Sequence, residues 1–300
     1  MSKFYLNYKN NKYKYILLTF DNNYVLQSKE LVLSINKNTS YNVCFIVITE
    51  FLNENSIEIL KDLMIPFIIY TIDNNIFTLK QESKWPYIIF AKLIAPFIIE
   101  EKMDYLYYMD SDFLCINNID PMFKIQFKQS IAMCPELAGN FPTKHSKLCS
   151  SLEVYCNCGF VIYNVEKFKI YFSKDNIINS INSMMDDLIV YEQDFLNIYF
   201  KDDIKILNQV IFNNQIHEYF KKFRNVNFIT QNTILVHFSF KKPWKNDCYL
   251  KSINFYLSKC TTNEMRKMVK KAKIINLLLL IPRLILKIIK KIFLKNAEVN

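Results

Sequence analysis

Short apolar segments of strand length alternate with segments of helical spacing through the first quarter of the chain. Strands are predicted for residues 15–20, 43–48 and 67–72, each rich in β-branched or aromatic residues. Helices are predicted between them, for residues 24–36 and 55–63, where apolar side chains recur every three or four positions. This rhythm is typical of a parallel sheet covered by helices. We therefore expect an α/β fold with a mostly parallel central sheet and helices on both faces.

The same two patterns recur further along the chain. Helices are predicted for residues 86–99, an apolar segment with one charge at Lys92, and for residues 183–199. Further strands are predicted for residues 105–109, 131–134, 159–163, 204–207 and 234–238. For residues 105–109, periodicity alone leaves a short buried helix open as the alternative.

Two carboxylates, Asp110 and Asp112, stand one residue apart where the predicted strand 105–109 ends. In an open α/β sheet, ligands bind at the carboxyl ends of the strands. Carboxylates this close repel each other unless a cation lies between them, and oxygen ligands suit Mg²⁺ or Mn²⁺. The pair therefore predicts a metal site, and a solvated turn is the alternative.

His237 lies at the end of the predicted strand 234–238. Imidazole is an acceptable ligand for Mn²⁺ and a poorer one for Mg²⁺, so His237 could complete a metal set with Asp110 and Asp112. The alternative is a core histidine whose ring nitrogens are satisfied by hydrogen bonds.

The scarcity of glycine limits how the chain could bind phosphate. Only 2 glycines occur, Gly139 and Gly159, which excludes a Gly-rich phosphate-binding loop. A diphosphate would need a metal ion and basic side chains instead. Lys92 and Lys242 are the candidates, although most lysines are simply solvated.

Three polar residues, Glu192, Gln193 and Asp194, stand together in an otherwise apolar segment. They are candidates for a polar pocket. The alternative is a helix start, where acidic side chains meet the positive end of the helix dipole.

The 8 cysteines are scattered, without the spacing of a zinc site, and predict reduced thiols in a cytosolic protein. The N-terminal residues are polar and charged, which argues against a secretory signal.

Positive charge is concentrated at the C-terminal end. Residues 259–300 hold 11 of the 38 basic residues but only 2 of the 28 acidic ones. From Arg283 onward, basic and apolar side chains fall on opposite sides of a predicted helix. The apolar run is shorter than the about 20 residues that span a bilayer, so we expect a helix lying on a membrane surface. The alternative is a helix docked on the protein's own core. Nucleic-acid binding is not expected, because the tail lacks interleaved aromatic residues.

In this order and spacing, the segments resemble those of glycosyltransferase family 8, especially its bacterial lipopolysaccharide and lipooligosaccharide galactosyl- and glucosyltransferases. The resemblance covers about residues 15–250. The matching segments are Asp21-Asn22-Asn23-Tyr24, Asp110-Ser111-Asp112, Asn157-Cys158-Gly159, Glu192-Gln193-Asp194, and His237 with Lys242-Pro243-Trp244.

The resemblance implies a GT-A type fold and retaining transfer of a hexose from a UDP-sugar to a hydroxyl of a glycan or glycolipid of lipopolysaccharide type. It divides the chain into a catalytic domain, residues 1–258, and a membrane-associating tail, residues 259–300. The protein would be cytoplasmic and peripheral on the inner face of the membrane.

The resemblance also implies roles for single residues. Mn²⁺, with Mg²⁺ as the alternative, would be bound by Asp110, Asp112 and His237. The uridine would lie near Asp21, Asn23 and Tyr24, and Lys242 would meet the diphosphate. Lys92 stands where the family has an arginine that contacts the donor. The donor-sugar pocket would be lined by Asn157, Glu192, Gln193 and Asp194, with Gln193 nearest the reacting carbon.

Three departures from the family pattern stand out. Glu192 replaces the usual aspartate, and Phe240 replaces a glycine three residues after the histidine. The spacing from His237 to Lys242 is one residue shorter than the commonest form. Phe240, together with Lys92 in place of the arginine, leaves a catalytically impaired membrane-bound scaffold open as an alternative. A nucleotide-sugar hydrolase or nucleotidyltransferase with the same metal set is a second alternative.

Overall fold

The computed structural model of the protein describes residues 1–9, 11–73, 87–137, 147–216 and 229–279. These residues form two compact units. The first contains Met1–Gln215 and the segment that ends at His237. The second contains Ile216 and continues from Phe238.

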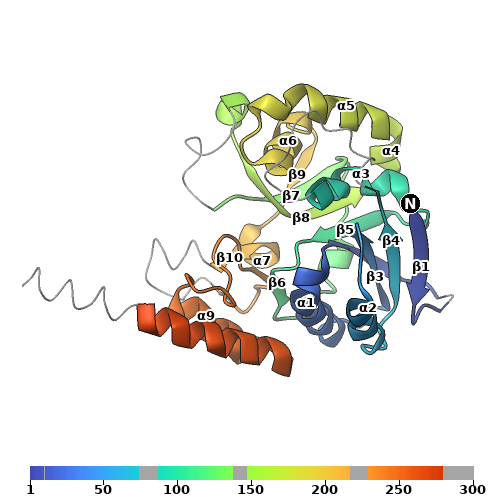
Figure 1. Ribbon diagram of the computed structural model, residues 1–300. Coiled ribbons are helices and arrows are strands. Elements are labelled where there is room, and N and C mark those ends of the chain that lie inside the picture. Colours follow the sequence, from blue (N-terminus) through green and yellow to red (C-terminus); the bar gives the residue numbers. More distant parts are fainter. Residues whose placement is uncertain (10, 74–86, 138–146, 217–228, 280–300) are drawn as a thin grey trace, which may run out of the picture. The chain divides into compact units, whose positions relative to one another are not determined.

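An eight-stranded sheet forms the centre of the first unit, in the order β1-β4-β3-β2-β5-β8-β7-β9 (Figure 1). Strands β1 and β8 are antiparallel to their neighbours, and all the other strands of this sheet run in one direction. The strands are β1 (Ser2–Leu6), β2 (Lys14–Thr19), β3 (Val43–Thr49), β4 (Phe67–Thr71), β5 (Tyr105–Met109), β7 (Ile131–Pro135), β8 (Cys156–Asn164) and β9 (Ile204–Ile206). The predicted mostly parallel sheet is confirmed.

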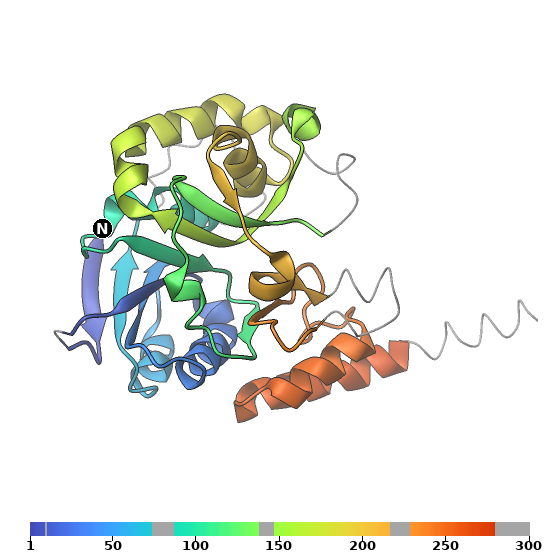
Figure 2. The ribbon, with the colours of Figure 1, turned by 180° about the vertical axis from the view of Figure 1, so that it is seen from behind.

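Helices cover both faces of this sheet, as Figures 1 and 2 show from opposite sides. Successive strand residues point to opposite faces, so Ile16 and Leu18 join one core while Tyr15 and Leu17 join the other. One core includes residues of α1 (Val25–Lys37) and α2 (Glu54–Lys61). The other includes residues of α3 (Ala91–Ile98), α4 (Val165–Tyr171), α5 (Lys174–Met184) and α6 (Tyr191–Tyr199).

Two predicted helices differ from the observed ones. The described part of the segment predicted as 86–99 begins with a 3₁₀ turn, Tyr87–Phe90, before α3; residue 86 lies outside the described residues. The segment predicted as one helix, 183–199, is divided, because α5 ends at Met184 and α6 begins at Tyr191. The Asp194 carboxylate explains this break, since it accepts hydrogen bonds from the amides of Ile189 and Val190 just before α6.

A second sheet of three strands brings the histidine to the carboxylates. It consists of β10 (Asn214–Gln215), β11 (Leu235–His237) and β6 (Phe113–Cys115), and α7 (Gln209–Phe212) precedes β10. Strands β11 and β6 are antiparallel, with His237 opposite Phe113. Because Phe113 directly follows Asp112, this register places the histidine beside the carboxylate pair. The sequence predicted β11 but missed β6 and β10, which are too short to show periodicity.

The second unit contains α9 (Leu250–Lys259) and a helix over residues 263–279. The ring of Tyr256 packs edge-on against the rings of Phe238 and Trp244. The later helix is anchored by Asn276, which donates a hydrogen bond to the Lys245 carbonyl. Within the described residues, no helix has the length and apolar character needed to cross a membrane. The predicted amphipathic segment from Arg283 lies outside the described residues.

Candidate active site

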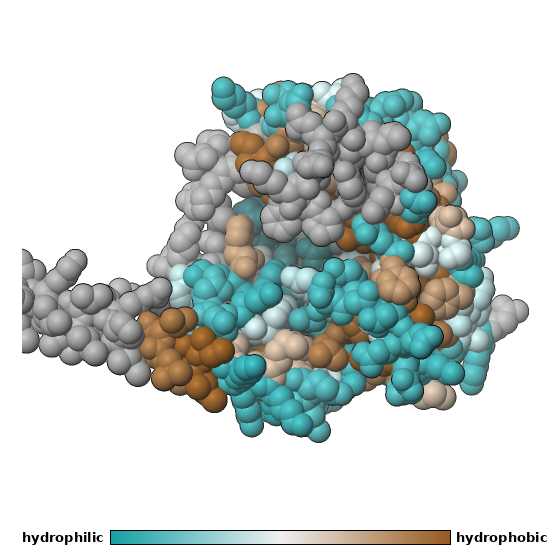
Figure 3. All heavy atoms as spheres, viewed as in Figure 1, coloured by the Kyte–Doolittle hydropathy of each residue, from teal (hydrophilic) through white to brown (hydrophobic). Residues whose placement is uncertain are grey.

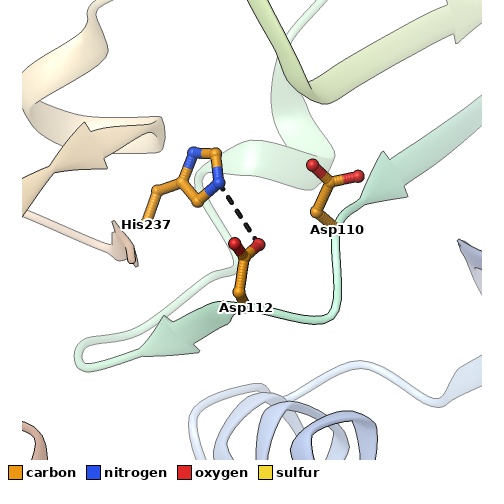
Figure 4. Close-up of side chains that lie close together, drawn as sticks. All are labelled: Asp110, Asp112 and His237. Carbon is orange, nitrogen blue, oxygen red and sulfur yellow. Dashed lines mark ion pairs between the residues drawn. The ribbon is translucent and has the colours of Figure 1, made fainter. Parts of the chain in front are cut away.

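Three side chains that could bind a metal ion lie together in the first unit. One ligand atom from each of Asp110, Asp112 and His237 lies within 4.8 Å of the others. Figure 4 shows them directed toward one another from the ends of β5, β6 and β11. The His237 Nε2 atom is 3.2 Å from Asp112 Oδ1. Two carboxylates and one imidazole fit Mn²⁺ better than Mg²⁺.

The hydrogen bonds behind His237 determine which of its nitrogens faces a metal. The Gly159 amide donates to Asn157 Oδ1, so this atom is an acceptor. It also receives the Asn213 amide at 2.9 Å, which makes the other Asn213 atom an oxygen. That oxygen lies 2.9 Å from His237 Nδ1, which must therefore donate. Nε2 is then the nitrogen that can coordinate a metal ion, the arrangement typical of metal-binding histidines.

Gly159 leaves the space in which these ligands meet. A Cβ atom at this position would lie 2.6 Å from His237 Cε1 and 3.0 Å from Asp110 Oδ2. The histidine ring is 3% exposed and stacks on Phe113, with 4.2 Å between ring centroids, so it has little room to move away. Glycine is therefore needed here for close approach rather than for backbone freedom.

Lys92 lies buried between the metal ligands and the neighbouring polar residues. Its Nζ atom is 3.4 Å from Asp110 Oδ1 and 3.4 Å from Glu192 Oε1. It also lies 4.5 Å from the centre of the Tyr108 ring. Burial alone would lower the pKa of Lys92, but the surrounding negative groups, led by Asp110, raise this pKa well above its usual value. Lys92 is therefore positively charged in this structure, and its charge is paired with the Asp110 and Glu192 carboxylates.

A proline helps to hold Lys92 in place. Pro96, inside α3, has no amide hydrogen to donate to the carbonyl of Lys92 four residues earlier. The Tyr163 hydroxyl donates to that carbonyl instead, at 2.8 Å. This bond ties α3 to β8 at the position of the buried charge.

A cluster of hydrogen-bonded amides and carboxylates adjoins the metal ligands. Glu136 Oε2 accepts hydrogen bonds from Asn157 Nδ2 at 2.8 Å and from Gln193 Nε2 at 3.2 Å. Gln193 Oε1 accepts from the Cys158 amide at 3.1 Å. The other Glu136 oxygen is buried with no hydrogen-bond partner among the described residues, a costly state that is typical of functional sites. Glu136 and Asn213 were missed, and only their polarity next to apolar segments could have pointed to them.

The two acidic neighbours of Gln193 have different surroundings. Glu192 faces Lys92, and burial raises the pKa of its carboxyl although Lys92 opposes this effect. Asp194 is fully buried and accepts hydrogen bonds from Tyr155 Oη at 2.6 Å and from the Ile189 and Val190 amides at 2.8 Å. These contacts hold the start of α6, so a catalytic role for Asp194 stays a prediction.

The sequence pattern of the family described as "Glycosyl transferase family 8" matches residues 15–248, which include every predicted site residue. The chain belongs to glycosyl transferase family 8. It is thus a glycosyltransferase, and the resemblance read from its motifs is confirmed.

Two relatives of this family 8 enzyme come from Escherichia coli. A lipopolysaccharide 1,2-glucosyltransferase is 25% identical over 261 residues, which cover 79% of this chain and 74% of the relative. The lipopolysaccharide glucosyltransferase WaaO of strain K12 is 23% identical over 244 residues, which cover 75% of this chain and 70% of the relative.

Solved structures show the same fold. An active-site mutant of LgtC matches with a TM-score of 0.70 at 16% identity, covering 85% of this chain and all of that one. The galactosyltransferase LgtC in complex with donor and acceptor sugar analogs matches with a TM-score of 0.67 at the same identity and coverage. The predicted GT-A type fold of the family 8 enzyme is confirmed.

The segment predicted to bind uridine lies at the carboxyl end of β2. Asp21 caps the short 3₁₀ turn that follows, accepting a hydrogen bond from the Asn23 amide at 2.9 Å. Asn22 ties this turn to the next loop, because its side chain donates to the Phe51 carbonyl and accepts from the Asn53 amide. Asn23 is exposed, and Asp21 and Tyr24 are partly exposed, so a ligand could reach this segment.

Two other predicted features belong to the second unit. Lys242 is partly exposed and belongs to the second unit, whereas the metal ligands belong to the first. Its contact with a diphosphate therefore stays a prediction. Phe240 has a φ angle of 59° and is 63% exposed. Its backbone is thus in the left-handed region that glycine adopts readily and phenylalanine does not. Phe240 thus adopts a backbone conformation that a glycine at this position would adopt with less strain.

Proposed function

We propose that this enzyme is a retaining glycosyltransferase that moves a hexose from a UDP-sugar to a hydroxyl of a lipopolysaccharide-type glycan or glycolipid. One observation carries the proposal. The ligand set of Asp110, Asp112 and His237 adjoins the polar cluster of Glu136, Asn157 and Gln193, within a family 8 fold. The metal set suits a diphosphate leaving group, and the amides and carboxylate of the cluster suit the hydroxyl groups of a sugar.

Separate groups of residues would bind the UDP and the sugar of the donor. Asp110, Asp112 and His237 would hold Mn²⁺, which when bound supplies Lewis acidity to the departing diphosphate. Lys242 would add positive charge there, and Asp21, Asn23 and Tyr24 would hold the uridine. Glu136, Asn157 and Gln193 would bind the sugar.

The hydrogen bonds of the cluster favour same-face substitution over a covalent intermediate. Gln193 is a poor nucleophile, and its oxygen already accepts from the Cys158 amide and from Asn157 Nδ2. The Asp194 carboxylate is fully buried and occupied by its own donors. Neither oxygen is poised to attack the sugar. Trapping of a sugar bonded to Gln193 or Asp194 would overturn this mechanism.

The proposed acceptor is membrane-borne, and the second unit carries features that suit a lipid surface. Ile274, Leu277, Leu278 and Leu279 are exposed near the end of the helix 263–279, where Figure 3 shows a hydrophobic area. Lys267, Lys270 and Lys271 are exposed on the same helix. Each basic residue near anionic lipid contributes about 1 kcal/mol of attraction. We propose peripheral binding to the inner face of the membrane, tested by sedimentation with vesicles with and without anionic lipid.

The deciding experiment is a screen of UDP-sugars for Mn²⁺-dependent turnover, with and without a lipopolysaccharide acceptor. Release of UDP, together with a glycoside of unchanged anomeric configuration, supports the proposal. Formation of UMP and a sugar phosphate would instead identify a nucleotidyltransferase or a pyrophosphate-cleaving hydrolase. Donor binding without any turnover would favour a scaffold.

A further inference from the structure

The two oxygens of the Asp110 carboxylate have different surroundings. Oδ1 accepts a short hydrogen bond from the Tyr108 hydroxyl and lies 3.4 Å from Lys92 Nζ. Oδ2 lies beside the space left by Gly159, where His237 Cε1 is also found. One oxygen is therefore occupied by the protein, and the other faces the metal ligands.

The strand geometry explains how Tyr108 reaches Asp110. Side chains two residues apart on a strand lie on the same face, and Asp110 directly follows β5, which contains Tyr108. The Tyr108 side chain is 1% exposed, so its hydroxyl depends on protein partners.

A second hydroxyl sets the direction of the hydrogen bonds. Thr19 Oγ1 lies 3.1 Å from the Tyr108 oxygen. A phenol has a single proton, and Tyr108 gives it to Asp110, so Thr19 must be the donor in the other contact. Thr19 ends β2, two residues before Asp21. A chain of hydrogen bonds thus runs from the last residue of β2 to a metal ligand.

We propose that Tyr108 is a positioning residue for the metal site: its hydroxyl holds Oδ1 of Asp110 so that Oδ2 is presented to the ion. The inference rests on the proposed metal-dependent function. Lys92 also contacts Oδ1, but its charge is shared with Glu192, whereas the Tyr108 proton is directed to Asp110 alone. Loss of the hydroxyl leaves Oδ1 with the shared contact to Lys92, so the carboxylate is held less firmly and ion binding must restore its orientation.

The strand contains its own control. Tyr107 is also 1% exposed, but it lies in the core on the opposite face of the sheet. Its hydroxyl has no hydrogen-bond partner among the described residues. The pair Tyr108→Phe and Tyr107→Phe thus removes one buried hydroxyl each from adjacent residues, and only one of these hydroxyls contacts a metal ligand.

The test is a titration of the full-length protein with Mn²⁺ alone, in which free Mn²⁺ is followed by electron paramagnetic resonance. We expect Tyr108→Phe to weaken Mn²⁺ binding by about tenfold, as typically seen for residues that orient metal ligands. Tyr107→Phe should bind Mn²⁺ as the wild type does. Thr19→Val, one bond further out, should weaken binding by about threefold.

Equal Mn²⁺ affinity in Tyr108→Phe and the wild type would overturn the inference, even if Tyr108→Phe melts at a lower temperature. An equal loss in Tyr107→Phe would also overturn it, since the effect would then come from packing. A different result would show that the proposed function itself is wrong. In that case the wild type and Asp112→Asn would give the same Mn²⁺ titration, because no binding would depend on Asp112.

Discussion

The proposed metal-binding side and the proposed sugar-binding side of the candidate site, called the metal side and the sugar side below, differ in how they are built. On the metal side, Asp110, Asp112 and His237 converge from three strand ends, and a Cβ atom at Gly159 would collide with His237. On the sugar side, Glu136, Asn157 and Gln193 share one set of hydrogen bonds, and one Glu136 oxygen has no partner among the described residues. The metal side is a closed arrangement that tolerates little change, while the sugar side has bonding capacity left for a ligand. Substitutions on the metal side should therefore abolish both Mn²⁺ binding and sugar transfer, while those on the sugar side should reduce transfer alone.

The largest effect is expected from loss of a metal ligand. Asp112→Asn keeps the shape of the side chain but removes the negative charge beside His237. We expect kcat/KM to fall by more than about 100-fold, since even the residues behind metal ligands contribute 10- to 100-fold. Mn²⁺ binding and sugar transfer should be lost together, which parallel titration and turnover assays can measure.

Asp120→Asn is the matched control. Asp120 is also nearly buried, at 9% exposure, but its carboxylate accepts hydrogen bonds from Thr39 and Ser40. Its replacement should lower stability while the Mn²⁺ affinity stays unchanged. If both variants lost Mn²⁺ binding equally, the loss would reflect unfolding. Asp112 would then have no specific role in binding Mn²⁺.

A single added methyl group should be the next most damaging change. In Gly159→Ala the new Cβ would meet His237 Cε1 at 2.6 Å and Asp110 Oδ2 at 3.0 Å. Because the stacked ring of His237 is buried, we expect the ligands to separate and Mn²⁺ affinity to fall by about 10- to 100-fold. The measurement is a Mn²⁺ titration beside a thermal melt without metal. A folded variant with normal affinity would show that the metal side is less tightly packed than the contacts indicate.

The sugar side should respond in the opposite way. Glu136→Gln keeps one acceptor for the two amides but removes the charge and the unpaired oxygen. We expect transfer to fall by about tenfold or more, because a buried polar group that meets the substrate would be lost. Mn²⁺ affinity should stay within about twofold. Transfer rates and Mn²⁺ titrations on the same preparations provide the check, with the exposed Glu153→Gln as the control. A matching loss of Mn²⁺ affinity would remove the distinction between the two sides.

The same contrast explains what could be predicted from the sequence. Asp110 and His237 stand where apolar segments end, so both could be proposed as metal ligands at strand ends from the sequence. The β6–β11 register that places His237 beside Asp112 could not be read from it. The polar cluster depends on which side chains meet across strands, as when Asn213 bonds to both His237 and Asn157. Such contacts leave no periodic pattern. The break between α5 and α6 was missed for the same reason, because it depends on the hydrogen bonds of one buried carboxylate.

The smallest effect is expected for Phe240, which belongs to the second unit and to neither the metal side nor the sugar side. Its φ angle of 59° places a phenylalanine where glycine is favoured. Left-handed backbone costs a residue with a Cβ about 1–2 kcal/mol, and the extra chain entropy of glycine offsets part of the gain. We expect Phe240→Gly to melt about 2 °C higher than Phe240→Ala, which also removes the ring but keeps the strain. The Mn²⁺ affinity of both variants should equal that of the wild type. A Phe240→Gly protein that melts no higher than the alanine variant would mean that the loop does not hold this strain in solution.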